Sequence, residues 1–154
     1  MTRARLNVFF DVDFTLLSID GSLRPGTRET FQRLIADGHR IFIWSGVGIR
    51  TTEIAEHELQ HLVSDVFIKP QEDLEAGLTR FGVHTRPDFV VDDDARIVTN
   101  FGGMLVQPYY FSNTDDIEMD LIYLLVSRFA ETGNPEHAAF RIGRNGKRSN
   151  NSCL

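Results

Sequence analysis

The chain has 154 residues, the usual length of one domain, with 42% apolar and 25% charged residues. Twelve phenylalanines can form a sizeable core and argue against global disorder. The net charge of −6 argues against broad nucleic-acid binding, although a local basic patch is compatible with it. The single cysteine, Cys153, allows no internal disulfide, and no apolar stretch reaches the length of a membrane span. We expect a globular cytoplasmic protein with no membrane partner.

Five short apolar runs, rich in Val, Ile and Phe, predict strands that are buried on both faces. They are residues 6–10, 41–44, 63–68, 89–91 and 104–106. Helical patterns alternate with these runs around residues 31–38, 49–62, 70–81 and 115–131. The alternation predicts an α/β fold with a mainly parallel five-stranded sheet that helices cover on both sides.

Two further segments depart from this alternation. Residues 16–26 contain Asp20-Gly21 in their middle, which predicts a small β-hairpin flap at the end of the first strand. From about Thr132 the composition becomes polar and rich in Gly, Asn and Arg, which is typical of a partly disordered tail. We therefore expect one catalytic domain over residues 1–131 and a tail over residues 132–154.

Chemically active side chains follow four of the predicted strands. In strand order they are Asp11, Asp13 and Thr15; Ser45 and Gly46; Lys69; and Asp92, Asp93 and Asp94. Ligands of open α/β sheets bind outside the carboxyl ends of the strands, so we expect these groups to share one rim. A turn or a helix cap could explain each residue singly, but four such strand ends in order favour a site.

Each of these groups has a use in phosphoryl transfer. A carboxylate can attack phosphorus and form an aspartyl-phosphate, and a second acid two residues later can serve as general acid and base. Clustered acids hold Mg²⁺, which offsets the repulsion between an anionic nucleophile and an anionic substrate. Hydroxyls and a lysine hold the phosphate oxygens, because this catalysis rests on positioning and electrostatics.

The order Asp-x-Asp-x-Thr, strand-end serine, lysine and acid cluster resembles the haloacid dehalogenase (HAD) superfamily, in particular its phosphatases, over residues 6 to about 108. The resemblance implies a Rossmann-like three-layer α/β/α sandwich and Mg²⁺-dependent hydrolysis of phosphomonoesters. Asp11 would be the nucleophile, and Asp13 would be the acid and base that also gives its backbone carbonyl to the metal. Phe14 stands where the family often has glycine, at a position that varies.

The resemblance implies that each of the other residues acts either on the nucleophile and phosphate or at the metal. The residues at the nucleophile and phosphate would be Thr15, Ser45, Gly46 and Lys69. At the metal, directly or through water, it places Asp11, Asp13, Asp92 and Asp93. The sequence leaves open which of the last acids is the direct ligand, and Asp94 has the alternative role of capping the next helix.

Family members acquire specificity from cap domains inserted after the first-strand hairpin or between the lysine and the last acids. The interval between Thr15 and the second strand is long enough for a hairpin and one helix, and the interval between Lys69 and Asp92 is long enough for one helix. Neither interval leaves residues for a cap domain. The chain therefore resembles a capless member. Such an open site admits a large phosphorylated substrate, or a neighbouring subunit of a homo-oligomer shields a small one. Arg24, near the base of the hairpin, is either a substrate contact or a solvated charge.

Residues 57–61, His-Glu-Leu-Gln-His, match the HExxH signature of zinc proteases. On a helix over residues 49–62, Ile54 and Leu59 belong to the apolar stripe, and the histidine pair lies roughly 120° from its centre. No third ligand continues the motif. Surface histidines are therefore the favoured interpretation, and a zinc-dependent hydrolase is an alternative function.

Two other protein classes use similar groups on a similar sheet. A response-regulator receiver has its phosphorylated aspartate before the hydroxyl and the lysine, whereas here the acid triplet comes last. A non-enzymatic phosphate-binding module of the same fold is a further alternative, although no expected chemical position is lost. The substrate is open among nucleotides, sugar phosphates, phosphoproteins and nucleic-acid ends, and the negative charge disfavours the last.

Overall fold

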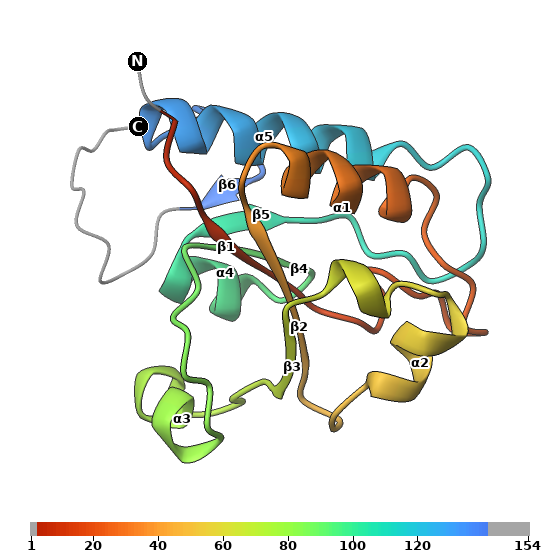
Figure 1. Ribbon diagram of the computed structural model, residues 1–154, viewed down its shortest axis with the longest axis horizontal. Coiled ribbons are helices and arrows are strands. Elements are labelled where there is room, and N and C mark those ends of the chain that lie inside the picture. The colour runs from red at the N-terminus through yellow and green to blue at the C-terminus, as the bar shows by residue number, and fades with distance from the viewer. Residues whose placement is uncertain (1–2, 142–154) are drawn as a thin grey trace.

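The computed structural model of the protein describes residues 3–141, which form one sheet with helices on both faces (Figure 1). The sheet has six strands in the order β3-β2-β1-β4-β5-β6. Neighbouring strands are parallel except β5 and β6, which are antiparallel. The α/β architecture predicted from the sequence, with a mainly parallel sheet between two helical layers, is confirmed.

Strands and helices alternate along the chain as far as β5. The strands are β1 (Asn7–Phe10), β2 (Arg40–Ser45), β3 (Asp65–Ile68), β4 (Phe89–Asp92), β5 (Gly103–Leu105) and β6 (Phe140–Arg141). The helices are α1 (Thr27–Ala36), α2 (Thr51–Glu56), the 3₁₀ helix η1 (Gln60–Leu62), α3 (Leu74–Arg80), α4 (Ala95–Phe101) and α5 (Glu118–Thr132). Across residues 3–141, none of these helices combines the length and the apolar character that crossing a membrane would require.

The central strands bury apolar side chains on both faces, because successive side chains of a strand point in opposite directions. In β1, Val8 and Phe10 pack into a cluster with residues of α1 and α5, which lie side by side over one face (Figure 1). Phe9 packs into a second cluster with residues of α4 on the other face. This double burial explains why the strand sequences lack polar alternation.

The strand order reverses beside β1, which has β2 on one side and β4 on the other. Such a switch point leaves a crevice outside the carboxyl ends of the strands, where ligands bind. The register aligns these ends, since Phe10 of β1 pairs with Ile43 of β2 and with Val91 of β4. The residues that follow the three strands therefore share one edge of the sheet.

The sixth strand lies in the segment expected to be a polar tail. Phe140 and Arg141 pair with β5 at the sheet edge, and the Phe140 ring lies 5.5 Å from Phe129 and 6.1 Å from Phe89. These ring contacts hold residues 140–141 against the sheet. The sheet therefore has six strands and not the five expected. The rest of the expected tail, residues 142–154, lies outside the described residues.

The helix expected over residues 49–62 is interrupted. Helix α2 ends at Glu56, Glu58 has a left-handed backbone with φ of 55°, and a separate 3₁₀ turn follows. The Leu59 N–H donates to the Ile54 carbonyl over 3.0 Å, which is the hydrogen bond of a Schellman cap. A glycine usually marks this cap, and without one the sequence predicts a continuous helix.

Residues 16–26 form a compact turn with little strand character. Leu17 and Leu23 make a single antiparallel bridge, and Gly21 has φ of 84°, which agrees with the turn predicted at the Asp-Gly pair. Leu16 and Leu17 are buried in the core. The turn therefore packs against the sheet and supports the loop after β1.

Candidate active site

The loop after β1 is a tight backbone turn that brings two predicted site residues together. The N–H groups of residues 15–17 donate to the Val12 carbonyl over 2.9 to 3.2 Å. Phe14 has φ of 63°, in the left-handed region that favours glycine, which explains why glycine suits this position. The turn places Thr15 next to Asp11, and the Thr15 hydroxyl donates to Asp11 Oδ2 over 3.2 Å.

Lys69 lies between the carboxylates of Asp11 and Asp92. Its backbone N–H donates to the Ser45 carbonyl over 2.9 Å, just beyond the last residue of β3. Its ammonium donates to Asp11 Oδ1 and to Asp92 Oδ2, both over 2.9 Å. All three side chains are buried, so these charge-assisted hydrogen bonds lie in a low dielectric and are strong.

Three carboxylates form a potential cation site beside this lysine. One oxygen from each of Asp11, Asp92 and Asp93 lies within 4.8 Å of the others, the one such group of metal-binding residues found in residues 3–141. Oxygen ligands in this arrangement suit a hard divalent cation. Asp94 does not join them, because its carboxylate caps α4 by accepting the Arg96 N–H over 2.9 Å. Its capping role, one of the two alternatives, is confirmed.

Crowding and burial change the titration of these acids. Burial raises the pKa of Asp11 to about 8, with a further rise from Asp92 and an opposing effect of Lys69. Burial likewise raises the pKa of Asp92 to about 6, against the lowering effect of Lys69. Burial lowers the pKa of Lys69, but the two carboxylates outweigh it and the net shift is upward. One ammonium therefore does not compensate these carboxylates, and a divalent cation would supply the missing positive charge.

Asp13 lies at the mouth of the site, with its side chain 41% exposed. Arg50 Nη1 donates to Asp13 Oδ2 over 2.7 Å and to the Ser45 hydroxyl over 3.3 Å. The Ser45 hydroxyl also accepts the Val47 N–H over 3.2 Å. Arg50 was not predicted from the sequence, because no motif surrounds it. Its place in the β2–α2 loop, which directly follows Ser45, was the only signal available.

An open cavity of about 360 Å³ lies over these residues. It is lined by Asp11, Asp13, Ser45, Gly46, Val47, Lys69 and Gln71. Gly46 permits the close approach of Gln71, because a Cβ at Gly46 would lie 1.8 Å from Gln71 Nε2. Gln71, which sequence analysis did not single out, therefore borders the cavity beside the strand-end serine.

The structure does not bring Arg24 to this cavity. Its side chain is fully buried, and its guanidinium pairs with Asp116 over 2.9 Å. It also donates to the carbonyl oxygens of Thr15 and Gln107 over 3.0 and 2.6 Å. Arg24 is therefore neither an exposed substrate contact nor a solvated charge. It joins the loop after β1 to the segment between β5 and α5.

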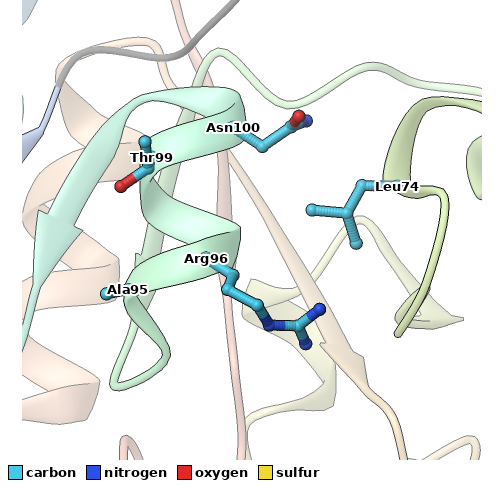
Figure 2. A pocket seen from close by; sticks show the side chains of 5 residues that line it. All are labelled: Leu74, Ala95, Arg96, Thr99 and Asn100. Atoms are coloured by element: carbon cyan, nitrogen blue, oxygen red, sulfur yellow. The ribbon is translucent and has the colours of Figure 1, made fainter.

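A second hollow, of about 520 Å³, lies between α3 and α4. Figure 2 shows Leu74 of α3 facing Arg96 and Asn100 of α4 across this space. Arg96 donates to the Gln71 carbonyl over 2.8 Å, and Asn100 donates to a Glu75 carboxylate oxygen over 2.9 Å. None of its lining residues was predicted to belong to the site, so the smaller cavity over Asp11 is the candidate active site.

The HExxH residues do not form a zinc-protease helix. His57 is the C-cap of α2 and His61 lies in η1, so the two histidines do not share one helical face as the signature requires. His57 Nε2 lies 2.9 Å from the Gly21 carbonyl, and His61 is exposed. The interpretation as surface histidines fits these positions.

A model of the haloacid dehalogenase-like hydrolase family matches residues 8–68, from β1 to the end of β3. No curated protein and no solved structure matches the chain. The matched segment contains Asp11, Asp13 and Ser45, in the sheet and at the strand ends described above. The match covers residues 8–68 of 154 and supports the resemblance to the haloacid dehalogenase superfamily of hydrolases over this segment.

Proposed function

We propose that the protein is a Mg²⁺-dependent phosphomonoester hydrolase that acts through an aspartyl-phosphate on Asp11. The setting of the Asp11 carboxylate supports this most directly. One oxygen accepts the Thr15 hydroxyl and the other accepts the Lys69 ammonium, with the acids of β4 alongside. These donors orient the nucleophile, and orientation with electrostatic stabilisation supplies most of the catalysis in phosphoryl transfer.

In the first step, an Asp11 carboxylate oxygen bonds to phosphorus while the bond from phosphorus to the ester oxygen breaks. The departing oxygen takes a proton from Asp13, whose carboxyl lies at the exposed mouth of the cavity. In the second step, water attacks phosphorus, Asp13 takes a proton from that water, and the bond to Asp11 breaks. The products are the alcohol and inorganic phosphate, and both acids return to their starting states.

The side chains around the cavity suit a bound phosphoryl group. Ser45 offers a hydroxyl, Lys69 offers an ammonium, and Arg50 brings a second positive charge within 3.3 Å of that hydroxyl. Fixed donors and cations of this kind stabilise charge that develops on the phosphoryl oxygens. Gly46 lines the cavity beside Gln71, whose amide takes the space that a Cβ at position 46 would need.

The carboxylate cluster fits Mg²⁺, which prefers oxygen ligands and keeps several waters. The ligands would be the carboxylates of Asp11, Asp92 and Asp93 and, as the family resemblance implies, the backbone carbonyl of Asp13. The ion would reduce the repulsion between the ionised nucleophile and the anionic phosphate.

We also infer an open active site of the capless type. Between β1 and β2 the chain contains one compact turn and α1, and between β3 and β4 it contains α3. Neither interval has room for a cap domain. A large phosphorylated substrate, or a small one shielded by a neighbouring subunit, suits such a site. A cytoplasmic location, which the single cysteine supports, completes the proposal.

Hydrolysis of 4-nitrophenyl phosphate, followed as nitrophenolate release, tests the proposal. We expect activity with Mg²⁺, loss of activity in EDTA, and recovery with excess Mg²⁺. The double variant His57→Ala/His61→Ala is the matched control and should keep its rate. Undiminished activity in chelator, or recovery with zinc but not magnesium, would contradict the proposal. Loss of activity in the histidine variant would favour the zinc alternative.

A further inference from the structure

Large apolar side chains gather on the loops around the proposed active site. Nine such side chains are exposed in residues 3–141. Six of them lie on the segments that follow β1, β2 and β5: Ile19, Val47, Ile49, Tyr110, Phe111 and Ile117. Phe111 is 74% exposed and Tyr110 is 51% exposed. Of these six, Val47 lines the cavity over Asp11. Exposed apolar groups gathered on loops at one edge of a sheet indicate a surface that contacts a ligand.

One aromatic member of this group, Tyr110, lies against the residue that follows the proposed general acid, and Phe111 comes next in the chain. Phe14 directly follows Asp13, and its ring centroid lies 5.1 Å from that of Tyr110. The Tyr109 N–H donates to the Phe14 carbonyl over 2.7 Å, so the segment after β5 lies beside the loop after β1 (Figure 1). We call the side chains of Phe14, Tyr110 and Phe111 the aromatic wall.

Buried Arg24 fixes the aromatic wall against the active-site loop. It donates to the Thr15 carbonyl on one side, and to the Gln107 carbonyl and the Asp116 carboxylate on the other. Its guanidinium also lies 5.1 Å from the ring centroid of buried Tyr109. The segment that carries the wall is thus held near both ends. A surface ordered in advance loses less entropy when a ligand binds.

The leaving group of the proposed reaction would depart past this surface. Asp13 would protonate the departing oxygen, and the aromatic wall begins at the next residue, Phe14. Val47 lines the same cavity and is exposed. Exposed rings favour a flat apolar group, which they contact through offset or edge-to-face packing.

We propose that the leaving group of the substrate carries an aromatic ring, which packs against the aromatic wall while Asp13 protonates the ester oxygen. This inference rests on the proposed phosphatase function. It narrows the substrate class to phosphomonoesters of ring-bearing alcohols or phenols. Tyr110 and Phe111 are then specificity-determining residues, and Arg24 is a positioning residue for them.

Benzyl, cyclohexylmethyl and ethyl phosphate separate ring contact from leaving-group acidity, because all three release a primary alkoxide. With the wild-type protein and Mg²⁺, kcat/KM should fall in that order. In the variant Tyr110→Ser/Phe111→Ser, the benzyl-to-ethyl ratio of kcat/KM should fall about tenfold, mainly through KM. The matched control is Phe81→Ser, which removes a 40% exposed ring at the C-cap of α3 and should keep the wild-type ratio.

An equal loss on benzyl and ethyl phosphate, or an unaltered ratio, would overturn the inference and leave the proposed function standing. Size-exclusion chromatography of the same samples tests whether a second copy of the chain, and not a leaving group, packs against the aromatic wall. A change from dimer to monomer in the double variant would assign the wall to a second copy of the chain and overturn the inference. If the wild-type protein hydrolyses none of the three esters, both the proposed phosphatase function and the inference about the aromatic wall are wrong.

Discussion

Binding of Mg²⁺ should expel a proton from Asp11, and the apparent affinity should therefore depend steeply on pH. Ligating carboxylates must be ionised, yet burial and the neighbouring Asp92 raise the pKa of Asp11 to about 8. Between pH 8 and pH 6, the ionised fraction of Asp11 falls from about one half to about one hundredth. The pKa of Asp92, about 6, contributes a further factor of about two. The apparent affinity should thus fall about a hundredfold.

Isothermal titration calorimetry at pH 6, 7 and 8, in two buffers of different ionisation enthalpy, measures both the affinity and the protons released. At pH 7 about one proton should leave for each Mg²⁺ bound. Asp94→Asn is the matched control, because Asp94 caps α4 outside the carboxylate cluster and should leave the pH dependence intact. Affinity that is independent of pH, with no proton release, would show that Asp11 is already ionised before Mg²⁺ binds.

The same pKa shift affects the stability of the metal-free protein. A raised pKa means that the folded protein binds the Asp11 proton more tightly than the unfolded chain does. This contribution to stability is fully present below the ordinary value of 3.8 and is lost as the pH rises towards about 8. Urea unfolding should therefore show a larger stabilisation by Mg²⁺ at pH 8 than at pH 6.

Two further predictions concern stability. Arg24→Met should lower the free energy of unfolding by about 3–5 kcal/mol, because it leaves Asp116 unpaired. The matched control is Arg96→Met at the exposed Arg96–Asp94 ion pair, which should lower the free energy of unfolding by under about 1 kcal/mol. Equal losses of stability in the two variants, measured by urea unfolding, would contradict the prediction. His39 Nδ1 accepts the Leu6 N–H, and burial lowers the pKa of His39 below 6.5, so stability should fall as the pH drops through this range. His39→Asn should weaken that dependence; an unaltered slope would count against it.

The acids of the site were predictable because the fold class determines where each strand ends. Buried apolar runs indicate parallel strands, and the residues after such runs meet at one edge of the sheet. Asp11, Lys69 and Asp92 follow such runs, and the structure joins them through hydrogen bonds of 2.9 Å. Local sequence therefore sufficed for groups that sit directly on the strand ends.

Long side chains that act between distant segments were not predictable in the same way. Arg24 pairs with Asp116, 92 residues away, and nothing in the local sequence of either residue indicates the partner. The break after α2 is similar, because Arg28 donates to the carbonyl oxygens of His57 and Glu58 from a helix elsewhere in the chain. Those contacts satisfy the end of α2 without the glycine that usually marks a helix terminus.

In the proposed mechanism, Asp11 receives the phosphoryl group and Asp13 moves the proton. Asp11→Asn keeps the size of the side chain but removes the nucleophile, so turnover should fall to background. Asp13→Asn keeps the nucleophile and should still react with an aryl phosphate, whose phenolate needs little protonation. Its phosphoryl-enzyme should then persist, because activation of water also requires Asp13.

Intact-mass spectrometry of the Asp13→Asn variant, mixed with Mg²⁺ and 4-nitrophenyl phosphate in a single turnover, separates the roles of the two aspartates. We predict the added mass of one phosphoryl group, located on Asp11 by peptide fragmentation, and no adduct in the Asp11→Asn variant. An Asp13→Asn variant that shows no adduct, and that loses activity on aryl and alkyl phosphates as completely as Asp11→Asn does, would contradict this assignment of roles.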